Sequence, residues 1–234
     1  MNQAIFNEVK EKVDTILIPI GMLEAHGPHC ALGTDILIPR EFAKLLDETL
    51  GERLLIAPEI PYGHSYGLAP FSGTIDVSSE AFSLYVFEIG QQFIKQGFSK
   101  FIFLNGHGGN NPSLTTVAEK LSDLGAAILT INWFIDYREQ IKEIAPSPGH
   151  AGEDETSLVL AINEQYADLS VEHVGHHEIS VPSNVRAKNY GLKLYPNAYS
   201  GNAKAATKEK GDALFDRLTA LMIQDIKNFW EMDI

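Results

Sequence analysis

The chain has 234 residues, of which 44% are hydrophobic and 21% are charged, an ordinary balance for a globular protein large enough to bury a core. Its formal net charge of −13 argues against a nucleic-acid partner or an anionic membrane, since both require a basic surface. The single cysteine, Cys30, excludes an intrachain disulfide, and because no signal-peptide pattern is present we expect a cytoplasmic protein without a membrane span.

In chain order, the hydrophobic pattern predicts a surface helix at 1–12 and then alternating strands and helices. Short apolar runs predict strands at 14–21, 53–58, 100–105 and 126–133. Apolar residues at helical spacing predict helices at 36–50, 78–97, 113–124 and 210–231. Pro39 is expected in the first turn of its helix, where a proline is tolerated. The stretch 170–208 has little periodicity, and we expect loops and a short strand there.

This alternation predicts one α/β domain over residues 1–234, because neither a linker nor an internal repeat divides the chain. Strand–helix repeats form three layers, α/β/α, in which helices cover both faces of a mostly parallel sheet. Ligands of such sheets gather at the carboxyl ends of the strands. The loops after the strands at 14–21 and 100–105 are therefore the expected place for a site.

The segment after the first strand, "GMLEAHGPHCALGTD" at 21–35, carries the first candidates. Glu24 and His26 are two residues apart, so in an extended chain both side chains point the same way. A carboxylate and an imidazole that converge suit Zn²⁺, Mn²⁺ or Fe²⁺. Each candidate has a simpler alternative, His26 as a hydrogen-bonded loop histidine and Asp35 as a helix cap. Several polar groups packed at one strand edge are costly unless paired, which favours metal binding by the whole set.

The third strand runs into "NGHGGN", 105–110, which places His107 between two glycines. Small neighbours leave access to the imidazole, so His107 is a second candidate ligand at the same sheet edge. A glycine-rich turn between a strand and a helix also fits a phosphate, which its backbone N–H groups can bind. The sequence matches neither the dinucleotide-binding nor the Walker pattern, so phosphate binding is the weaker interpretation.

A third cluster, "GHAGEDETS" at 149–157, opens a helix. Glu153, Asp154 and Glu155 fall in its first turn, where acids are favoured, and a solvated acidic helix start accounts for two of the three. His150, just ahead of the helix and beside carboxylates, can donate or accept a proton near neutral pH.

Other polar residues each have two interpretations. His64 and Tyr66, in the long loop after the second predicted strand, line a pocket or lie on the surface. Cys30 is a small packed residue or, with a histidine beside it, a nucleophile. The histidines of "EHVGHHE" form a metal-binding patch, or they are solvated or lie at a subunit contact: His173, His176 and His177.

Taken together, these motifs resemble the creatininase (creatinine amidohydrolase) family. The matching elements are "PIGMLEAHGPHCALGTD", "SGTI" at 72–75, "NGHGGN" and "HAGEDETS", and they follow the family's order over roughly residues 14–160. The resemblance implies a Rossmann-like α/β fold, a hydrolytic centre with two divalent metal ions, and a homo-oligomer, often a hexamer. Zinc is the first expectation for the metal, with manganese or iron as alternatives.

The resemblance also implies roles for individual residues. Glu24 and His107 would hold one metal ion and His26 the other, with Asp35 bridging the two. His150 matches the family's catalytic histidine.

One position departs from the family pattern. The namesake enzymes carry a glutamate ligand two residues after the histidine of the N-G-H loop, where this chain has Gly109. We expect Glu155 to take its place, either as a ligand of the second ion or as a general base.

The substrate-binding residues differ as well. The namesake enzymes frame a small flat substrate with a tryptophan near the catalytic histidine, which this chain lacks, and Gly108 replaces an aromatic residue. Gly108, His64 and Tyr66 are expected to line a wider pocket. The family also resembles enzymes that deformylate a pyrimidine intermediate, open a dehydro-inosose ring or cut a modified peptide.

We therefore expect a hydrolase that cleaves a C–N bond of a small molecule, a cyclic amide or a formamide, with a metal-activated water. The alternatives are hydrolysis of a cyclic keto-inositol or a modified peptide on the same site. A further alternative is a non-catalytic module that binds a metal or a phosphate.

Overall fold

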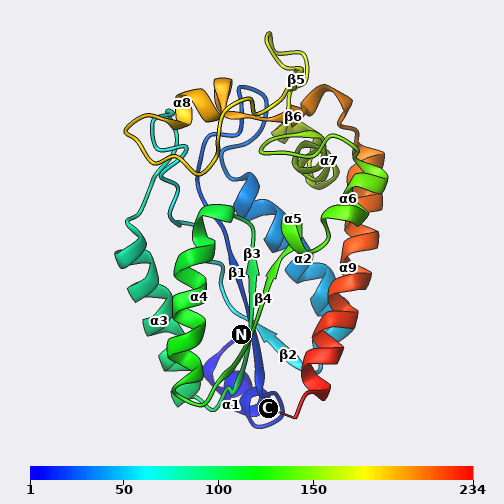
Figure 1. Ribbon diagram of the computed structural model, residues 1–234. Helices are drawn as coiled ribbons and strands as arrows, with labels where there is room; N and C mark the ends of the chain where they lie inside the picture. Colours follow the sequence, from blue (N-terminus) through cyan, green and yellow to red (C-terminus); the bar gives the residue numbers. More distant parts are fainter. Residues whose placement is uncertain (234) are drawn as a thin grey trace.

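The computed structural model describes residues 1–233 and has three layers, with the sheet in the middle (Figure 1). The sheet has the strand order β2-β1-β3-β4, and every neighbouring pair is parallel. Its strands are β1 (Thr15–Ile20), β2 (Leu54–Ile56), β3 (Lys100–Asn105) and β4 (Ala127–Asn132). The predicted mostly parallel α/β/α architecture is confirmed.

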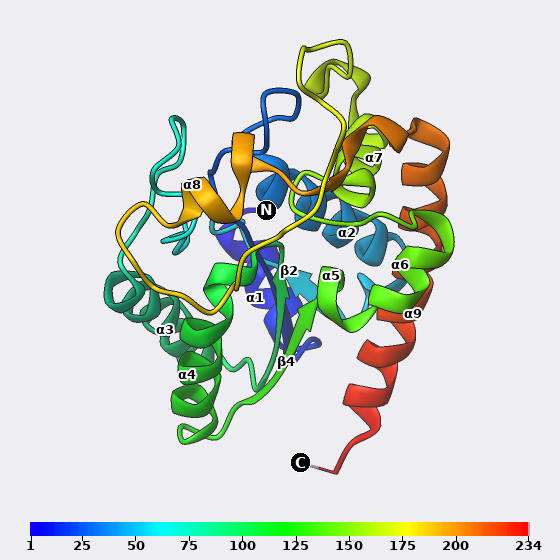
Figure 2. The same ribbon diagram turned by 45° about the horizontal axis from the view of Figure 1, so that its top comes forward.

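Helices cover both faces of the sheet (Figures 1 and 2). On one face lie α3 (Ser79–Lys95) and α4 (Asn111–Ser122), and on the other α2 (Thr34–Leu50), α7 (Glu153–Ile162) and α9 (Lys208–Glu231). The predicted N-terminal helix is α1 (Gln3–Lys10). Within residues 1–233, no helix is both long and apolar enough to cross a bilayer.

Short elements occupy the carboxyl end of the sheet. They are α5 (Trp133–Asp136), α6 (Arg138–Ile144), α8 (Gly191–Leu194) and the antiparallel strands β5 (His176–His177) and β6 (Gly201–Asn202). The hydrophobic pattern did not predict α5 and α6. The short strand expected between 170 and 208 is present, in a region that otherwise consists of loops and single helical turns.

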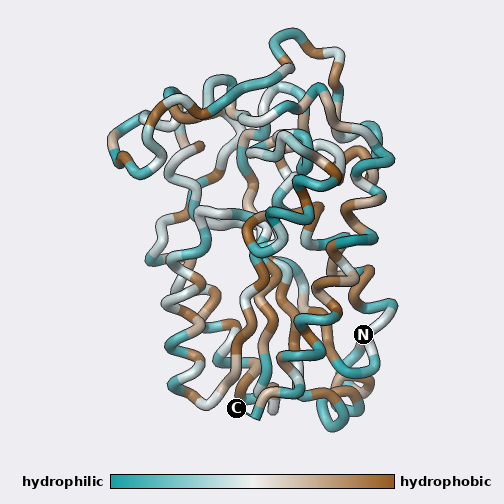
Figure 3. The backbone as a smooth tube through the Cα atoms, turned by 45° about the vertical axis from the view of Figure 1, so that its right-hand side comes forward, coloured by the Kyte–Doolittle hydropathy of each residue, from teal (hydrophilic) through white to brown (hydrophobic). Residues whose placement is uncertain are grey.

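Strand β1 shows why its sequence is a continuous apolar run and not an alternating one. Ile16 and Ile18 belong to the core that packs against α3 and α4, and Leu17 belongs to the core on the side of α2, α7 and α9. All three side chains are fully buried. A strand buried on both faces has no solvent side, so it requires an apolar residue at every position. The hydropathy colouring shows the apolar strands enclosed between the helix layers (Figure 3).

The prediction for Pro39 is wrong. Helix α2 begins at Thr34, so Pro39 lies inside it and not in its first turn. A proline there leaves the carbonyl four residues earlier, that of Asp35, without its helical hydrogen bond. That carbonyl lies against two glycines at the ends of β1 and β3, where an added Cβ would come within 2.5 Å of it at Gly21 and 2.3 Å at Gly106. The two glycines therefore allow the start of α2 to approach the sheet edge closely.

Candidate metal centre

The loop after β1 is fixed by a second loop that is distant in sequence. The Ala25 N–H donates to Thr74 Oγ1 at 3.0 Å, and the Ile75 N–H donates to the Leu23 carbonyl at 3.0 Å. Both partners come from the "SGTI" motif. These two hydrogen bonds fix the backbone on each side of Glu24, and they therefore restrict the position of its carboxylate.

Asp35 is directed at two histidines and does not cap its helix. Helix α2 has Gly33 as its N-cap residue, with no side-chain capping bond. Asp35 Oδ1 lies 3.0 Å from His26 Nε2, and Oδ2 lies 2.9 Å from His107 Nδ1. The capping alternative for Asp35 is therefore wrong.

Asparagines hold His107 in place. Asn105 Nδ2 donates to the His107 carbonyl at 2.7 Å. Asn110 Nδ2 donates to the Gly21 carbonyl at 3.2 Å, and Asn110 Oδ1 accepts the His64 N–H at 3.0 Å. The "NGHGGN" turn is thus tied both to the end of β1 and to the loop that carries His64.

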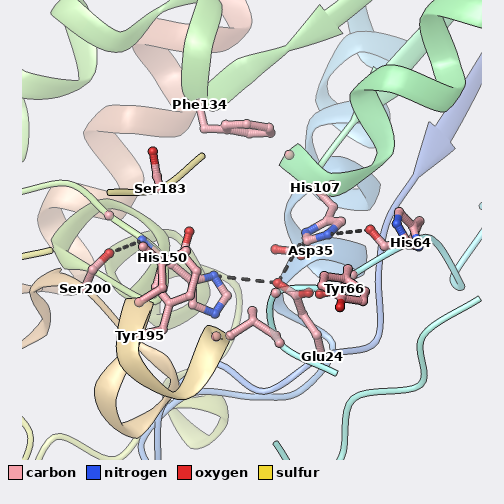
Figure 4. Close-up of a pocket in the computed structure, with 18 of the residues that line it drawn as sticks. Glu24, Asp35, His64, Tyr66, His107, Phe134, His150, Ser183, Tyr195 and Ser200 are labelled. Carbon is pink, nitrogen blue, oxygen red and sulfur yellow. Dashed lines mark hydrogen bonds and ion pairs between the residues drawn. The ribbon is translucent and has the colours of Figure 1, made fainter. Parts of the chain in front are cut away.

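Two groups of potential ligands meet at this edge of the sheet and share Asp35. Figure 4 shows Asp35 beside His107 and Glu24, the other members of the first group. In each group, one ligand atom per residue lies within 4.8 Å of the others. The first group is Glu24, Asp35 and His107, with His107 Nδ1 3.2 Å from Glu24 Oε1. The second is His26, Asp35 and Glu155, with His26 Nε2 3.6 Å from Glu155 Oε2. Four of these residues are the ligands that the resemblance implied, and Glu155 is the residue expected to take the place of the ligand missing at Gly109.

Backbone carbonyls orient both imidazoles. His26 Nδ1 lies 3.1 Å from the Glu24 carbonyl, and His107 Nε2 lies 3.1 Å from the His64 carbonyl. A carbonyl only accepts, so each of these outer nitrogens carries the hydrogen. When the imidazoles are neutral, the inner nitrogens, His26 Nε2 and His107 Nδ1, hold the lone pairs that could bind a cation. A backbone carbonyl is a usual hydrogen-bond partner for the other nitrogen of a metal-ligating histidine.

The carboxylate oxygens supply an independent test of whether a cation fits. Within residues 1–233, Glu24 Oε1, Glu24 Oε2 and Asp35 Oδ2 are buried and make no hydrogen bond. Glu24 Oε1 and Asp35 Oδ2 both approach a single nitrogen, His107 Nδ1, at 3.2 and 2.9 Å. One imidazole therefore faces two buried carboxylates, and burial penalises the charge that it leaves uncompensated. The donor set of imidazole nitrogens and carboxylate oxygens is also the set that zinc, manganese and iron accept. The residues present therefore fit divalent cations.

The buried charges of the cluster raise the pKa of three of the potential ligands, so without a metal these ligands tend to hold protons. Burial opposes a charge on His26, but Asp35, Glu155 and Glu24 outweigh it and raise its pKa to about 10. Burial also opposes a charge on His107, yet Glu24 and Asp35 raise its pKa well above the usual value. Burial raises the pKa of Glu155 as well. A cation bound here must displace protons from the imidazoles.

His150 approaches the cluster from another segment. Its Nε2 donates to the Ala25 carbonyl at 2.8 Å, which leaves Nδ1 free of a proton and 3.6 Å from Glu24 Oε1. Its ring centroid lies 5.3 Å from that of Tyr195 and 4.3 Å from that of His26. Burial, assisted by the charge of His26, lowers the pKa of His150 to about 4, so the ring is neutral at pH 7. Glu24, His26 and His150 also lie close enough together to form a third potential ligand group.

A strained turn connects His150 with Glu155. Ala151 has a φ of 46°, in the left-handed region that side chains other than glycine rarely adopt. Its N–H donates to Glu155 Oε2 at 2.6 Å, and its carbonyl lies 3.1 Å from both His29 Nε2 and Thr156 Oγ1. The sequence interpretation mentioned His29 only as a neighbour of Cys30. Its spacing of three residues from His26 was the signal that it belongs to the same loop.

The three acids at the start of α7 are all buried, so the interpretation as a solvated acidic helix start is wrong. Glu153 pairs with Lys210 and accepts the Ser147 N–H at 2.8 Å. Asp154 accepts the Gly149 N–H at 3.0 Å. Both therefore hold the chain around the turn, and Glu155 is the acid of the three that faces His26.

Most of the cluster lines a cavity of about 720 Å³: Glu24, Asp35, His107, His150 and Glu155. His64, Tyr66 and Gly108 line it, in the places that the sequence predicted for a pocket. Figure 4 shows Phe134 on the side of the cavity opposite Tyr195 and Glu24. Other lining residues lie in segments without periodicity or a motif, so the sequence does not single them out: Phe134, Arg138, Ser183, Arg186, Tyr190, Tyr195 and Ser200. Asp154 of the third cluster also lines the cavity.

The remaining candidates belong to no potential ligand group within residues 1–233. Cys30 is buried, and burial raises the pKa of its thiol to about 12, which leaves it protonated and a poor nucleophile. The side chains of His173 and His176 are 72% and 51% exposed. Neither residue, nor His177, belongs to a potential ligand group within residues 1–233.

Comparison with known proteins agrees with this geometry. The family described as creatininase, creatinine amidohydrolase, matches residues 1–226. The chain belongs to the creatininase family. It is accordingly a hydrolase, as its creatininase-family relatives are, and the predicted resemblance is confirmed.

Individual creatininase relatives differ in what they are named for. The chain is 28% identical to a 3-dehydro-scyllo-inosose hydrolase of Thermotoga maritima, over 98% of this chain and 83% of the relative. It is 31% identical to a mycofactocin precursor peptide peptidase of Mycolicibacterium smegmatis, over 96% and 83%. A solved structure named as a manganese creatininase superposes with a TM-score of 0.87 at 21% identity, over 99% of this chain and 97% of the other. A zinc–zinc form of a mutant creatininase superposes with a TM-score of 0.86.

Proposed function

We propose that this creatininase-family protein, a single domain over residues 1–234, hydrolyses a C–N bond of a small molecule with the help of two divalent metal ions. The bond is an amide, in a cyclic amide or a formamide. The observation that carries the proposal is the pair of buried ligand groups that share Asp35. Their buried carboxylate oxygens make no hydrogen bond within residues 1–233, and the outer nitrogens of their imidazoles face backbone carbonyls, and both observations support cation binding.

The ligands are proposed as follows. Glu24 and His107 would hold one ion, His26 and Glu155 would hold the other, and Asp35, which belongs to both groups, would serve both. Zinc, manganese and iron all accept this donor set, and solved creatininases named for manganese and for zinc support the first two. When bound, a pair of such ions makes a water acidic enough to ionise near pH 7 and polarises a carbonyl group.

His150 is proposed to move the proton. Its Nε2–H is held by the Ala25 carbonyl, so Nδ1 is the atom available for proton uptake. A neutral imidazole accepts a proton from the attacking water and passes it to the leaving nitrogen, which otherwise departs poorly. Glu155 Oε2 is the second candidate base. Its contact with the Ala151 N–H and with His26 favours a ligand role.

The pocket supports a small-molecule substrate. His64, Tyr66 and Gly108 are proposed to contact it, with Tyr195 and Phe134 on opposite sides of the space above the ligands (Figure 4). A cavity of about 720 Å³ lies within the range of sites for small molecules. The single buried cysteine supports a cytoplasmic location, and family membership supports a homo-oligomer such as a hexamer.

The second candidate function is hydrolysis of a cyclic keto-inositol or of a modified peptide on the same site. It is favoured by the activities for which the relatives from T. maritima and M. smegmatis are named. Product release over a panel of cyclic amides, formamides, keto-inositols and short peptides separates these classes.

The test is the variant His150→Ala in protein purified without chelator. We expect its metal content to equal that of the wild type while turnover falls roughly 10²–10⁴-fold, the usual contribution of acid–base catalysis. His173→Ala, with its exposed side chain, is the matched control and should retain full activity. Loss of one metal ion in His150→Ala would make His150 a ligand and overturn the assigned roles. A wild type that binds no ion would overturn the function.

A further inference from the structure

Arginine is distributed unevenly over the active-site pocket. Arg138 and Arg186 line the cavity, and no lysine within residues 1–233 does. They come from separate segments, Arg138 from the first turn of α6 and Arg186 from the loop 178–190. That loop joins β5 to α8 and crosses the carboxyl end of the sheet (Figure 2). The acidic side chains of the pocket belong to the metal-ligand cluster and to the start of α7, whereas the arginines come from α6 and the loop 178–190.

Neither pocket arginine has an acidic partner within residues 1–233, whereas two arginines elsewhere have structural partners. Arg40 pairs with Glu59 at 2.5 Å, and the Arg53 guanidinium lies 4.1 Å from the ring centroid of Trp230. Arg186 Nη1 donates to the carbonyls of Ser183 and Val185, at 3.2 Å each, which fixes one nitrogen and leaves the rest of the guanidinium available. Arg138 and Arg186 are both exposed to solvent, as is Arg217 on α9, which also has no acidic partner within residues 1–233. What distinguishes Arg138 and Arg186 is that they line the cavity.

The guanidinium group binds planar or tetrahedral oxyanions through parallel N–H donors, and such charge-assisted bonds are about twice as strong as neutral ones. The cavity is also larger than a small flat ring requires, so a substrate can reach from the ligand cluster to the arginines. Residues with apolar side chains also line the cavity, among them Phe134, Ile141 and Val185.

We propose that Arg138 and Arg186 form an anion-binding subsite, and that the natural substrate carries a carboxylate or a phosphate in addition to the bond that is cleaved. The subsite sets the substrate class and rests on the proposed hydrolytic function. The anionic end lies against α6 and the loop 178–190, and the scissile amide lies over the ligand cluster. Creatinine, which has no anionic group, does not use the subsite.

The experiment compares three formamides with the metal-loaded enzyme: N-formylglycinamide, which is neutral, N-formylglycine, which carries a carboxylate, and N-formyl-2-aminoethyl phosphate. We expect the wild type to prefer at least one charged probe. The preferred probe shows whether the natural substrate carries a carboxylate or a phosphate. In Arg138→Gln and Arg186→Gln, kcat/KM for that probe should fall about tenfold, mainly through KM, and kcat/KM for the neutral probe should stay within about twofold. Arg217→Gln, an exposed arginine of α9 outside the pocket, is the control.

Equal losses for charged and neutral probes, or no preference in the wild type, would overturn the subsite. If no probe is turned over, the subsite is tested by calorimetric titration of inorganic phosphate and of malonate into the same proteins. Binding that weakens about tenfold in the double variant Arg138→Gln/Arg186→Gln supports it. Binding that is undetectable in the wild type, or unchanged in the double variant, overturns it. A failure of the hydrolytic proposal is recognised separately, by the absence of bound metal or of turnover for any amide.

Discussion

The two ligand groups of the candidate centre are built in different ways. Glu24, Asp35 and His107 come from the ends of β1 and β3 and the start of α2, which meet at one sheet edge. The second group shares Asp35 but also needs Glu155, which comes from helix α7 and not from a strand end. The pairing of Ile20 with Asn105 in parallel register delivers the first group directly. The second depends on tertiary packing.

That packing can be traced through a few bonds. Glu155 is held by the N–H of Ala151, and the carbonyl of Ala151 is held by His29 and Thr156. On the other side, the ion pair between Glu153 and Lys210 joins the start of α7 to α9. One half of the centre therefore follows from sheet topology, whereas the other half is held by a strained turn and its supports.

The largest effect is expected at the residue that both halves share. Asp35→Asn removes a charge from both groups while keeping the shape of the side chain. Both ions should be lost, and activity should fall by much more than the roughly 10–100-fold typical of an outer partner. Metal content by mass spectrometry of the purified variant measures this. Retention of both ions would show that the two groups do not share a ligand.

A pair of variants separates the two halves. Glu155→Ala should leave one ion per chain bound at wild-type affinity and lose the other, and Glu24→Ala should do the same for the opposite ion. Metal titration followed by equilibrium dialysis gives the stoichiometry. Two ions bound with undiminished affinity in Glu155→Ala would exclude Glu155 as the replacement for the missing ligand at Gly109.

The pH dependence of metal affinity gives the next effect. Because buried carboxylates raise the pKa of His26 to about 10, the metal-free imidazole is protonated at pH 6–8 and a cation must displace one proton. Lowering the pH favours the protonated form and weakens binding. The affinity of the ion held by His26 should rise about tenfold per pH unit between pH 6 and 8. Calorimetry in buffers of different ionisation enthalpy counts the protons, and a pH-independent affinity would contradict the assignment.

The smallest effect is expected at His29, which supports the ligand group that contains Glu155. His29→Ala removes a donor to the Ala151 carbonyl, so Glu155 should be held less firmly and the affinity of its ion should fall about tenfold, within the range for outer partners. The ion held by Glu24 and His107 should be unaffected. His29→Gln, whose amide can donate to the same carbonyl, should restore part of the affinity, and His176→Ala serves as an exposed control. Equal weakening of both ions would show a general structural role.

Much of this could be predicted from the sequence, for reasons that are local. A strand such as β1, buried on both faces, must be apolar at every position, and the polar clusters that follow β1 and β3 must meet because parallel strands end together. The sequence therefore determined the layer order, the sheet edge that carries the site, and the candidate ligands Glu24, His26, Asp35 and His107.

Tertiary structure decided what local patterns leave open. Glu153, Asp154 and Glu155 are chemically alike and adjacent, and only the packing of α7 against Lys210 and the Ala151 turn determines which of them faces His26. Arg138 and Arg186 line the same cavity although they are distant in sequence, and the loop that carries Arg186 has no periodicity that could predict this. Periodicity records which face of an element is buried, whereas the direction of a single polar side chain depends on partners that are distant in sequence.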